Sequence, residues 1–266
     1  MHSQRASCGS GEDLDFDGLA ASVHRIERIQ QLSGLRFGMT DAPGWLRCDD
    51  LLDAPERLRA WQGRLADWLG TQYDEVPART VAAWIASWYL HVPARAAAVL
   101  FHHERRVPVS KLAFRLSDDR PHPAEIALLG DGFHCLPSDT AAARPEATVV
   151  ADEQELAAAL RDGYLAHATR FVDAYGPLSR LGRRSLWAAA TDALDTALWS
   201  AGEPDAGVAD AALVLGSRHA PLTAASTLRL TPEREWTRRL ESCCFSYLLP
   251  STPECDGCPR STPKQS

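Results

Sequence analysis

The C-terminal part of the chain is the feature that most limits how this sequence can fold. After Glu241 the residues are mainly Cys, Pro, Ser, Thr and Gly, and such a stretch cannot form a hydrophobic core of its own. It nevertheless holds four of the seven cysteines, namely Cys243, Cys244, Cys255 and Cys258. A segment of this composition is either flexible, with unpaired or disulfide-bonded cysteines, or held together by a bound metal, and the clustered cysteines favour the metal. The sequence therefore predicts a metal-dependent C-terminal segment.

The spacing of these cysteines bears on which metal they hold. Cys243 and Cys244 are adjacent, ten residues separate them from Cys255, and two more separate Cys255 from Cys258. The two-residue spacing lets a tight turn aim both sulfurs at one ion, and Gly257 lets the backbone approach closely. Four thiolates match both a tetrahedral zinc site and a [2Fe–2S] cluster. The side chains of adjacent residues diverge, so binding one zinc ion through both would strain the backbone. A dinuclear cluster is larger and needs less strain. The spacing therefore favours an iron–sulfur cluster, with a zinc site as the remaining alternative.

The same four cysteines resemble the signature of a known family. FhuF-type ferric-siderophore reductases, which are cytosolic [2Fe–2S] proteins, carry Cys-Cys, ten residues, Cys, two residues, Cys near the C-terminus. The resemblance extends more weakly to chain length, to Arg238 and Arg239 before the pair, and to the helix predicted from Ser185 onward. Between the cysteines this chain has Leu249 to Glu254 where typical members are often Gly-rich.

This resemblance implies an enzyme, an iron–sulfur oxidoreductase. Its four cysteines would hold a [2Fe–2S] cluster that passes one electron to a ferric siderophore. Ferrous iron, which siderophores bind far more weakly, would then be released in the cytosol. A ferredoxin or a flavoprotein reductase would reload the cluster. The alternative from another functional class is a zinc-stabilised protein without catalytic activity, acting as a small-molecule binding or scaffold module.

Other catalytic motifs are absent from the sequence. Neither G-x-S-x-G, G-x-G-x-x-G nor a P-loop pattern occurs, so a hydrolase triad or a nucleotide site is not indicated. The electron source is therefore expected on another protein. The isolated cysteines Cys8, Cys48 and Cys135 are expected to be inert.

Charge and hydropathy limit the partners and the compartment. The formal net charge is −7, which disfavours binding to nucleic acid. The N-terminus has no apolar run typical of a secretory signal. The longest apolar stretch, Val81 to Phe101, is interrupted by His91, Pro93 and Arg95, so no membrane span is expected. These features favour a cytoplasmic protein.

Hydrophobic periodicity predicts an α+β fold, helical with a small central antiparallel sheet, and the resemblance to the reductases implies a C-terminal cysteine-rich iron–sulfur segment. Helices are expected over residues 15–33, 51–70, 78–92, 152–175, 182–200, 205–216 and 233–240, with a further helical run from Pro93, which breaks or kinks the third helix, to Phe101. Strands are expected over residues 112–116, 125–129, 132–136, 148–151 and 226–231. The expected organisation is a disordered tail (1–14), an α+β siderophore-reductase-like body (15–240) and a [2Fe–2S]-binding segment (241–266).

Three further groups of residues are expected to have structural roles. The basic residues at 102–106 are expected to complement the negative end of a helix rather than to bind a metal or anion. Arg183 and Arg184 are expected on a solvated or ion-paired surface rather than in an anion site. The tryptophans at 84, 88, 187 and 199 are expected to fill the core, while Trp236 could pack the cysteine loop onto the body.

Overall fold

A computed structural model describes residues 17–29, 34–202 and 204–261 of the chain. The predicted N-terminal tail, residues 1–14, lies outside the described residues. The helices are α1 (Leu19–Ile29), α2 (Cys48–Leu52), α3 (Pro55–Gly70), α4 (Ala78–Glu104), α5 (Glu153–Ser179), α6 (Arg183–Trp199) and α7 (Pro204–Leu215), with a 3-10 turn η1 (Ser246–Leu248). The strands are β1 (Leu35–Phe37), β2 (Trp45–Arg47), β3 (Arg106–Pro108), β4 (Leu112–Leu116), β5 (Pro123–Leu128), β6 (Phe133–Cys135), β7 (Ala147–Val149), β8 (Arg229–Leu230) and β9 (Trp236–Thr237).

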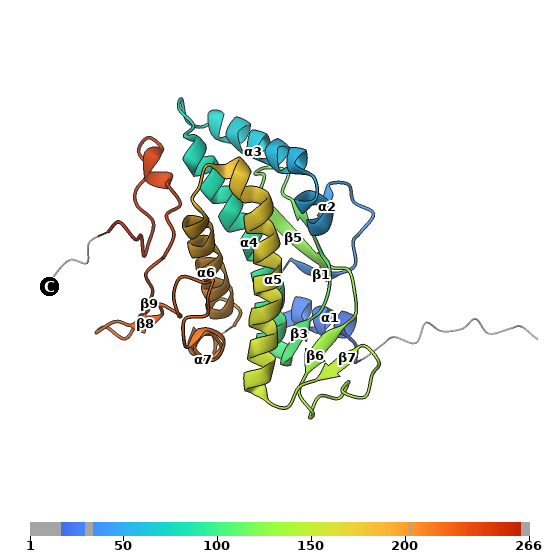
Figure 1. The fold of residues 1–266 in the computed structure, drawn as a ribbon. Coiled ribbons are helices and arrows are strands. Elements are labelled where there is room, and N and C mark those ends of the chain that lie inside the picture. The colour runs from blue at the N-terminus through green and yellow to red at the C-terminus, as the bar shows by residue number, and fades with distance from the viewer. Residues whose placement is uncertain (1–16, 30–33, 203, 262–266) are drawn as a thin grey trace, which may run out of the picture.

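Helix α4 lies at the centre of the molecule, with the sheets on one side and α6 with the C-terminal segment on the other (Figure 1). It is rich in alanine and buried along most of its length, which lets α5 and α6 pack closely against it. The helix continues through Pro93, so the predicted break is wrong. Packing on several sides outweighs the one backbone hydrogen bond that proline removes. No helix in the described part of the chain combines the length and apolar character needed to cross a membrane.

The α+β class is confirmed, but the sheets are mixed rather than antiparallel. One sheet has the order β1-β5-β4-β2, with β1 parallel to β5 and the other pairs antiparallel. A second has the order β3-β6-β7, with β6 parallel to β7. The connection from Cys135 to Ala147 explains the second case, because it is far longer than a hairpin turn and carries the chain back to the starting edge.

Two helix predictions need correction. The helix expected over 233–240 is a hairpin instead, in which β8 pairs with β9 and Thr231 and Glu235 close the turn by a 2.8 Å backbone hydrogen bond. Arg234 in this turn has a left-handed φ of 65°, which a helix excludes. The helix expected over 51–70 is divided into α2 and α3, because Pro55 starts a new helix.

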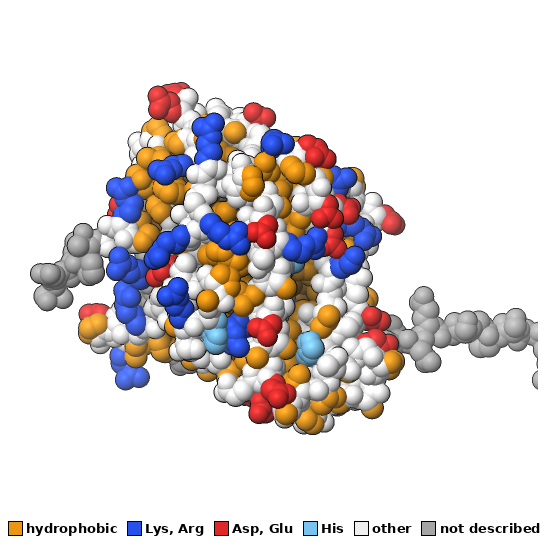
Figure 2. Space-filling model, in the orientation of Figure 1, with side chains coloured by type: hydrophobic (Ala, Val, Ile, Leu, Met, Phe, Trp, Pro, Cys, Tyr) orange, Lys and Arg blue, Asp and Glu red, His pale blue; other side chains and the backbone are white. Residues whose placement is uncertain are grey.

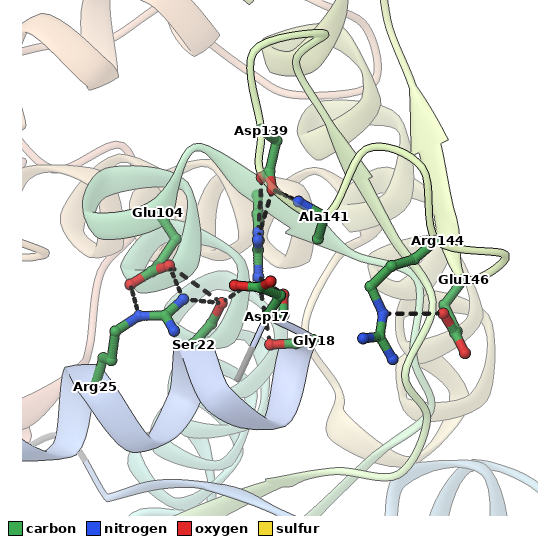
Figure 3. A network of polar contacts seen from close by, with 10 residues as sticks. Asp17, Gly18, Ser22, Arg25, Glu104, Asp139, Ala141, Arg144 and Glu146 are labelled. Carbon is green, nitrogen blue, oxygen red and sulfur yellow. Dashed lines mark hydrogen bonds and ion pairs between the residues drawn. The ribbon is translucent and has the colours of Figure 1, made fainter. Parts of the chain in front are cut away.

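The basic residues after α4 connect it to its surroundings. Arg106 is buried, and its guanidinium donates to both carboxylate oxygens of Asp139, at 2.7 and 2.6 Å, and to the Ser22 hydroxyl at 2.8 Å. Figure 3 shows Asp139 and Ser22 approaching this network from different elements. His102 lies 2.6 Å from the buried Asp210 carboxylate on α7. The structural role expected for this stretch is present, but its partners are carboxylates as well as the end of α4.

Candidate metal centre

A buried carboxylate on α6 fastens the chain immediately before the first cysteine. Asp192 accepts hydrogen bonds from the backbone amides of Glu241 (2.9 Å) and Ser242 (2.7 Å) and from the Ser242 hydroxyl (2.6 Å). Burial raises the pKa of Asp192, and the hydrogen bonds from Ser242 and Glu241 oppose that rise. A carboxylate that accepts three hydrogen bonds holds its partners firmly. Asp192 on α6 therefore fixes the position of the backbone next to Cys243.

A second carboxylate, one helical turn further along α6, holds the preceding part of the same segment. Asp195 is 2% exposed and accepts hydrogen bonds from the Ser226 hydroxyl at 2.6 Å and the Thr227 amide at 3.1 Å. Positions three residues apart lie on the same side of a helix, so both carboxylates face the C-terminal segment. The two anchors hold the chain on either side of the β8–β9 hairpin.

The second pair of cysteines is placed by a tight turn around Gly257. This glycine has a φ of 70°, and a Cβ there would lie 2.6 Å from the Arg238 carbonyl oxygen. Its own carbonyl accepts a hydrogen bond from the Leu240 amide at 2.8 Å, and the Cys258 amide donates to the Cys255 carbonyl at 3.1 Å. The turn therefore lies directly against the stretch that leads to Cys243, as the close approach predicted for Gly257 requires.

The structure brings two of the four predicted ligand sulfurs into contact. The Sγ atoms of Cys244 and Cys255 are 3.7 Å apart, and all four cysteines are free thiols. Two thiolates bound to one tetrahedral ion through bonds of 2.3 Å would lie about 3.8 Å apart, so this spacing fits a shared metal. Within the described ranges, no three Cys, His, Asp or Glu side chains converge on one point. Cys243 and Cys258 are thus neighbours of the contact rather than members of it.

The thiols raise one another's pKa. Burial raises the pKa of Cys255 to about 12, with additional contributions from Cys244 and then Cys258. Burial also raises the pKa of Cys243, and the neighbouring Cys244 and Cys258 add to the rise, while the Phe245 amide and Arg260 oppose it. Crowded thiols that resist ionisation become stable thiolates when a cation enters among them. The donor set therefore fits a metal or an iron–sulfur cluster chemically.

The strain expected at the adjacent cysteines is located in the residue that follows them. Phe245 has a left-handed φ of 56°, which costs a residue with a side chain on the order of 1 kcal/mol. This conformation lets the Phe245 amide donate to Cys243 Sγ at 3.4 Å. Thr80 at the start of α4 secures the turn, because its hydroxyl donates to the Phe245 carbonyl at 3.0 Å.

Ser246 and Trp84 also support this site, although the sequence pattern did not predict it. The Ser246 hydroxyl donates to Cys244 Sγ at 3.1 Å, and the Trp84 indole nitrogen donates to the Ser246 hydroxyl at the same distance. Trp84 was expected to fill the core, as Trp187 does, but it is only half-buried and faces the cysteine segment. The one signal in the sequence was that Thr80 and Trp84 are four residues apart and so share a helix face.

Trp84 also belongs to an aromatic cluster that sequence reasoning did not find. The Arg120 guanidinium lies over the rings of Trp68, Trp84 and Trp88, at 5.6, 5.5 and 4.8 Å from their centroids. Its Nε is buried and has no hydrogen-bond partner among the described residues. The rings supply the favourable electrostatic environment that this cation would otherwise lack. Nothing local in the sequence links Arg120 to these tryptophans.

A cavity of about 310 Å³ adjoins the inner side of the adjacent cysteines. Its walls include Cys243, Cys244, Asp192, His91 and Arg238. Burial lowers the pKa of His91, whose Nδ1 lies 2.8 Å from the Ser87 carbonyl, so the imidazole is neutral at pH 7. Both cysteines therefore border this cavity as well as being half-exposed at the surface.

No protein-family model matches this chain, and no curated protein matches its sequence.

Proposed function

We propose that the protein is a ferric-siderophore reductase of the FhuF type, in which Cys243, Cys244, Cys255 and Cys258 hold a [2Fe–2S] cluster. The observation that carries the proposal is the spacing of these cysteines in the sequence, together with the 3.7 Å contact between the sulfurs of Cys244 and Cys255. When bound, such a cluster supplies one electron at a time. One electron reduces siderophore-bound Fe(III) to Fe(II), which the siderophore binds weakly.

The chain's own residues would do three things for this reaction. The carboxylate of Asp192 holds the start of the cysteine segment on α6, and that of Asp195 holds Ser226 before the β8–β9 hairpin. Ser246 and the Phe245 amide direct hydrogen bonds at the sulfurs of Cys244 and Cys243, and such bonds stabilise added negative charge. The cysteines themselves are only half-buried apart from Cys258, so a large chelate can approach them from the surface.

The deciding experiment is spectroscopic. Freshly purified protein is examined anaerobically by visible absorption and electron paramagnetic resonance, before and after dithionite, and iron and zinc are assayed on the same sample. We expect about two irons per chain, visible absorption that bleaches on reduction and an S = 1/2 signal. Reduced protein mixed with ferric siderophores should then be reoxidised. About one zinc per chain with no colour would overturn the proposal in favour of the zinc-stabilised binding module.

Cysteine variants test the ligand assignment separately. Replacing Cys255 or Cys258 by serine should abolish the colour or make the cluster labile. Cys135→Ser is the matched control, because Cys135 is fully buried in β6 and remote from the segment. Unchanged iron content in both ligand variants, or loss of iron from the control, would show that the ligand set is wrong.

A further inference from the structure

The surface around the cysteine segment is rich in exposed arginines, although the chain as a whole has a net charge of −7. Figure 2 shows these basic side chains gathered on the left of the view, over the C-terminal segment seen in Figure 1. The exposed residues that define this basic face are Arg79, Arg180, Arg184, Arg229, Arg234 and Arg239. Positive charge is thus concentrated around the candidate metal centre.

The arginines of the basic face form no ion pairs with the described carboxylates. Within the described part of the chain, no carboxylate forms an ion pair with Arg180, Arg184 or Arg229, and Arg79 lies over the Phe245 ring instead. By contrast, the neighbouring Arg183 pairs with Asp173, as expected for an ion-paired surface. Five exposed carboxylates lie among these arginines, namely Glu233 and Glu235 in the β8–β9 turn and Glu241, Glu254 and Asp256 in the cysteine segment, so the face carries both signs of charge. Unpaired guanidinium groups at a protein surface attract an oppositely charged partner and speed its association.

The arrangement of the arginines favours a protein over a small anion. They come from separate elements: the first turn of α4, the turn between α5 and α6, the first turn of α6, the β8–β9 hairpin and the stretch before Cys243. A small chelate would need guanidinium groups that converge on one point, as in a bidentate clamp. Charges spread around a rim are typical of protein interfaces, where they orient the partner and leave the centre for close contact.

We propose that the basic face is the docking surface for an acidic one-electron carrier protein. This inference rests on the proposed function, because it assigns the surface through which the reductase is reloaded. The carrier gives up one electron and becomes oxidised by one unit, the centre between the cysteines gains that electron, and no covalent bond forms or breaks. Docking over the cysteine segment brings the two redox groups close, and the acidic body of the chain turns the carrier away from other surfaces.

The test compares two double variants with the same change in charge. Arg184→Glu with Arg229→Glu reverses two charges of the basic face, and the new glutamate in the first turn of α6 is favourable for that helix, so unfolding is not expected. Arg47→Glu with Arg59→Glu reverses two exposed arginines near α2 and on α3, away from the cysteines. The carrier is an acidic [2Fe–2S] ferredoxin, reduced and mixed with full-length protein in a stopped-flow instrument.

We expect the second-order rate of electron transfer to fall about tenfold in the first double variant and less than about twofold in the second. The wild-type rate should also fall as salt is added, because salt screens exposed charges. An equal fall in rate in both double variants would show that the effect comes from net charge alone and would overturn the proposal. So would an unchanged rate in the first double variant.

A binding measurement separates this inference from the proposed function. Oxidised ferredoxin is titrated into each protein and followed by calorimetry, which does not require a cluster. If the protein lacks iron but binds ferredoxin through Arg184 and Arg229, the proposed function fails and the docking surface stands. If the protein holds the cluster and reduces siderophores but the arginine substitutions leave its affinity for ferredoxin unchanged, only the docking-surface proposal is overturned. Loss of affinity for an anionic gallium chelate, or for duplex DNA, with ferredoxin binding unchanged, would assign the face to that ligand instead.

Discussion

The indole nitrogen of Trp84 lies 3.1 Å from the hydroxyl oxygen of Ser246, and this contact joins α4 to the cysteine segment. An indole N–H can only donate, so the serine oxygen accepts there and its own proton is free for Cys244 Sγ, also at 3.1 Å. A thiolate bound to a metal can only accept. The direction of the chain from Trp84 through Ser246 to Cys244 is therefore fixed once the site is loaded.

The chain of hydrogen bonds from Trp84 through Ser246 to Cys244, called the relay below, should affect the reduction potential of a bound cluster. Replacing Ser246 by alanine removes a hydrogen bond that stabilises the more negative, reduced state. One such bond contributes about 1 kcal/mol, which corresponds to roughly 40 mV for one electron, so the potential should fall by about that amount. Trp84→Phe should lower it by less, because the serine proton then loses only its orientation. The measurement is an optical redox titration.

A control for the relay lies in the same loop. Thr252 has a hydroxyl whose hydrogen bond goes to the Pro250 carbonyl and not to a sulfur. Thr252→Ala should leave the potential unchanged. If Thr252→Ala and Ser246→Ala shift the potential equally, the effect belongs to the loop as a whole and the relay has no role.

Asp192 should determine how firmly the cysteine segment is attached. Asp192→Ala leaves the Glu241 and Ser242 amides without their acceptor, and a hydrogen bond to a charged group contributes about 1.5–3 kcal/mol. We expect faster proteolysis after residue 240 and faster loss of iron, with Asp192→Asn intermediate because it keeps one acceptor oxygen. Limited proteolysis and iron assays measure these effects. Asp173→Ala, which removes only an exposed ion pair with Arg183, should change neither.

Much of the body could be predicted from hydrophobic spacing, since α6 and β4 lie where the pattern placed them. The direction of β7 could not, because strand order depends on contacts between residues far apart in the chain and not on alternation within one strand. The same limit explains the helix expected over 233–240, where pairing with β8 outweighs local helical propensity.

For the candidate site, sequence spacing identified the four cysteines but not what surrounds them. Asp192 and Trp84 act on the segment across separations of about 50 and 160 residues in the chain, and no local pattern marks them. Gly257 is different, because a glycine between two cysteines already suggests a tight turn. Features that depend on neighbouring residues could be predicted from the sequence. Anchors that depend on the packing of α4 and α6 could be identified only in the structure.

Gly257 gives the sharpest test of that turn. Gly257→Ala would place a Cβ 2.6 Å from the Arg238 carbonyl oxygen in a left-handed conformation. The turn must move to relieve the overlap, so we expect at least half of the iron to be lost while the helical body stays folded. Circular dichroism and an iron assay distinguish these effects. Gly163→Ala on α5 is the matched change, since a Cβ there meets no atom within 4 Å, and it should retain full iron content.

The body itself should lose stability in acid through His167. Burial lowers the pKa of His167 to about 4, and its Nε2 lies 2.8 Å from the Tyr89 hydroxyl, with Arg170 and Asp49 as the nearest charges. Because the folded pKa is depressed below the ordinary 6.5, the unfolded chain takes up the proton first as the pH falls. The stabilisation from the neutral imidazole is complete above pH 6.5 and is lost as the pH falls towards 4, by about 3 kcal/mol. In urea titrations, His167→Gln should show a correspondingly smaller fall in the free energy of unfolding. Identical pH profiles for the wild type and His167→Gln would contradict the assignment.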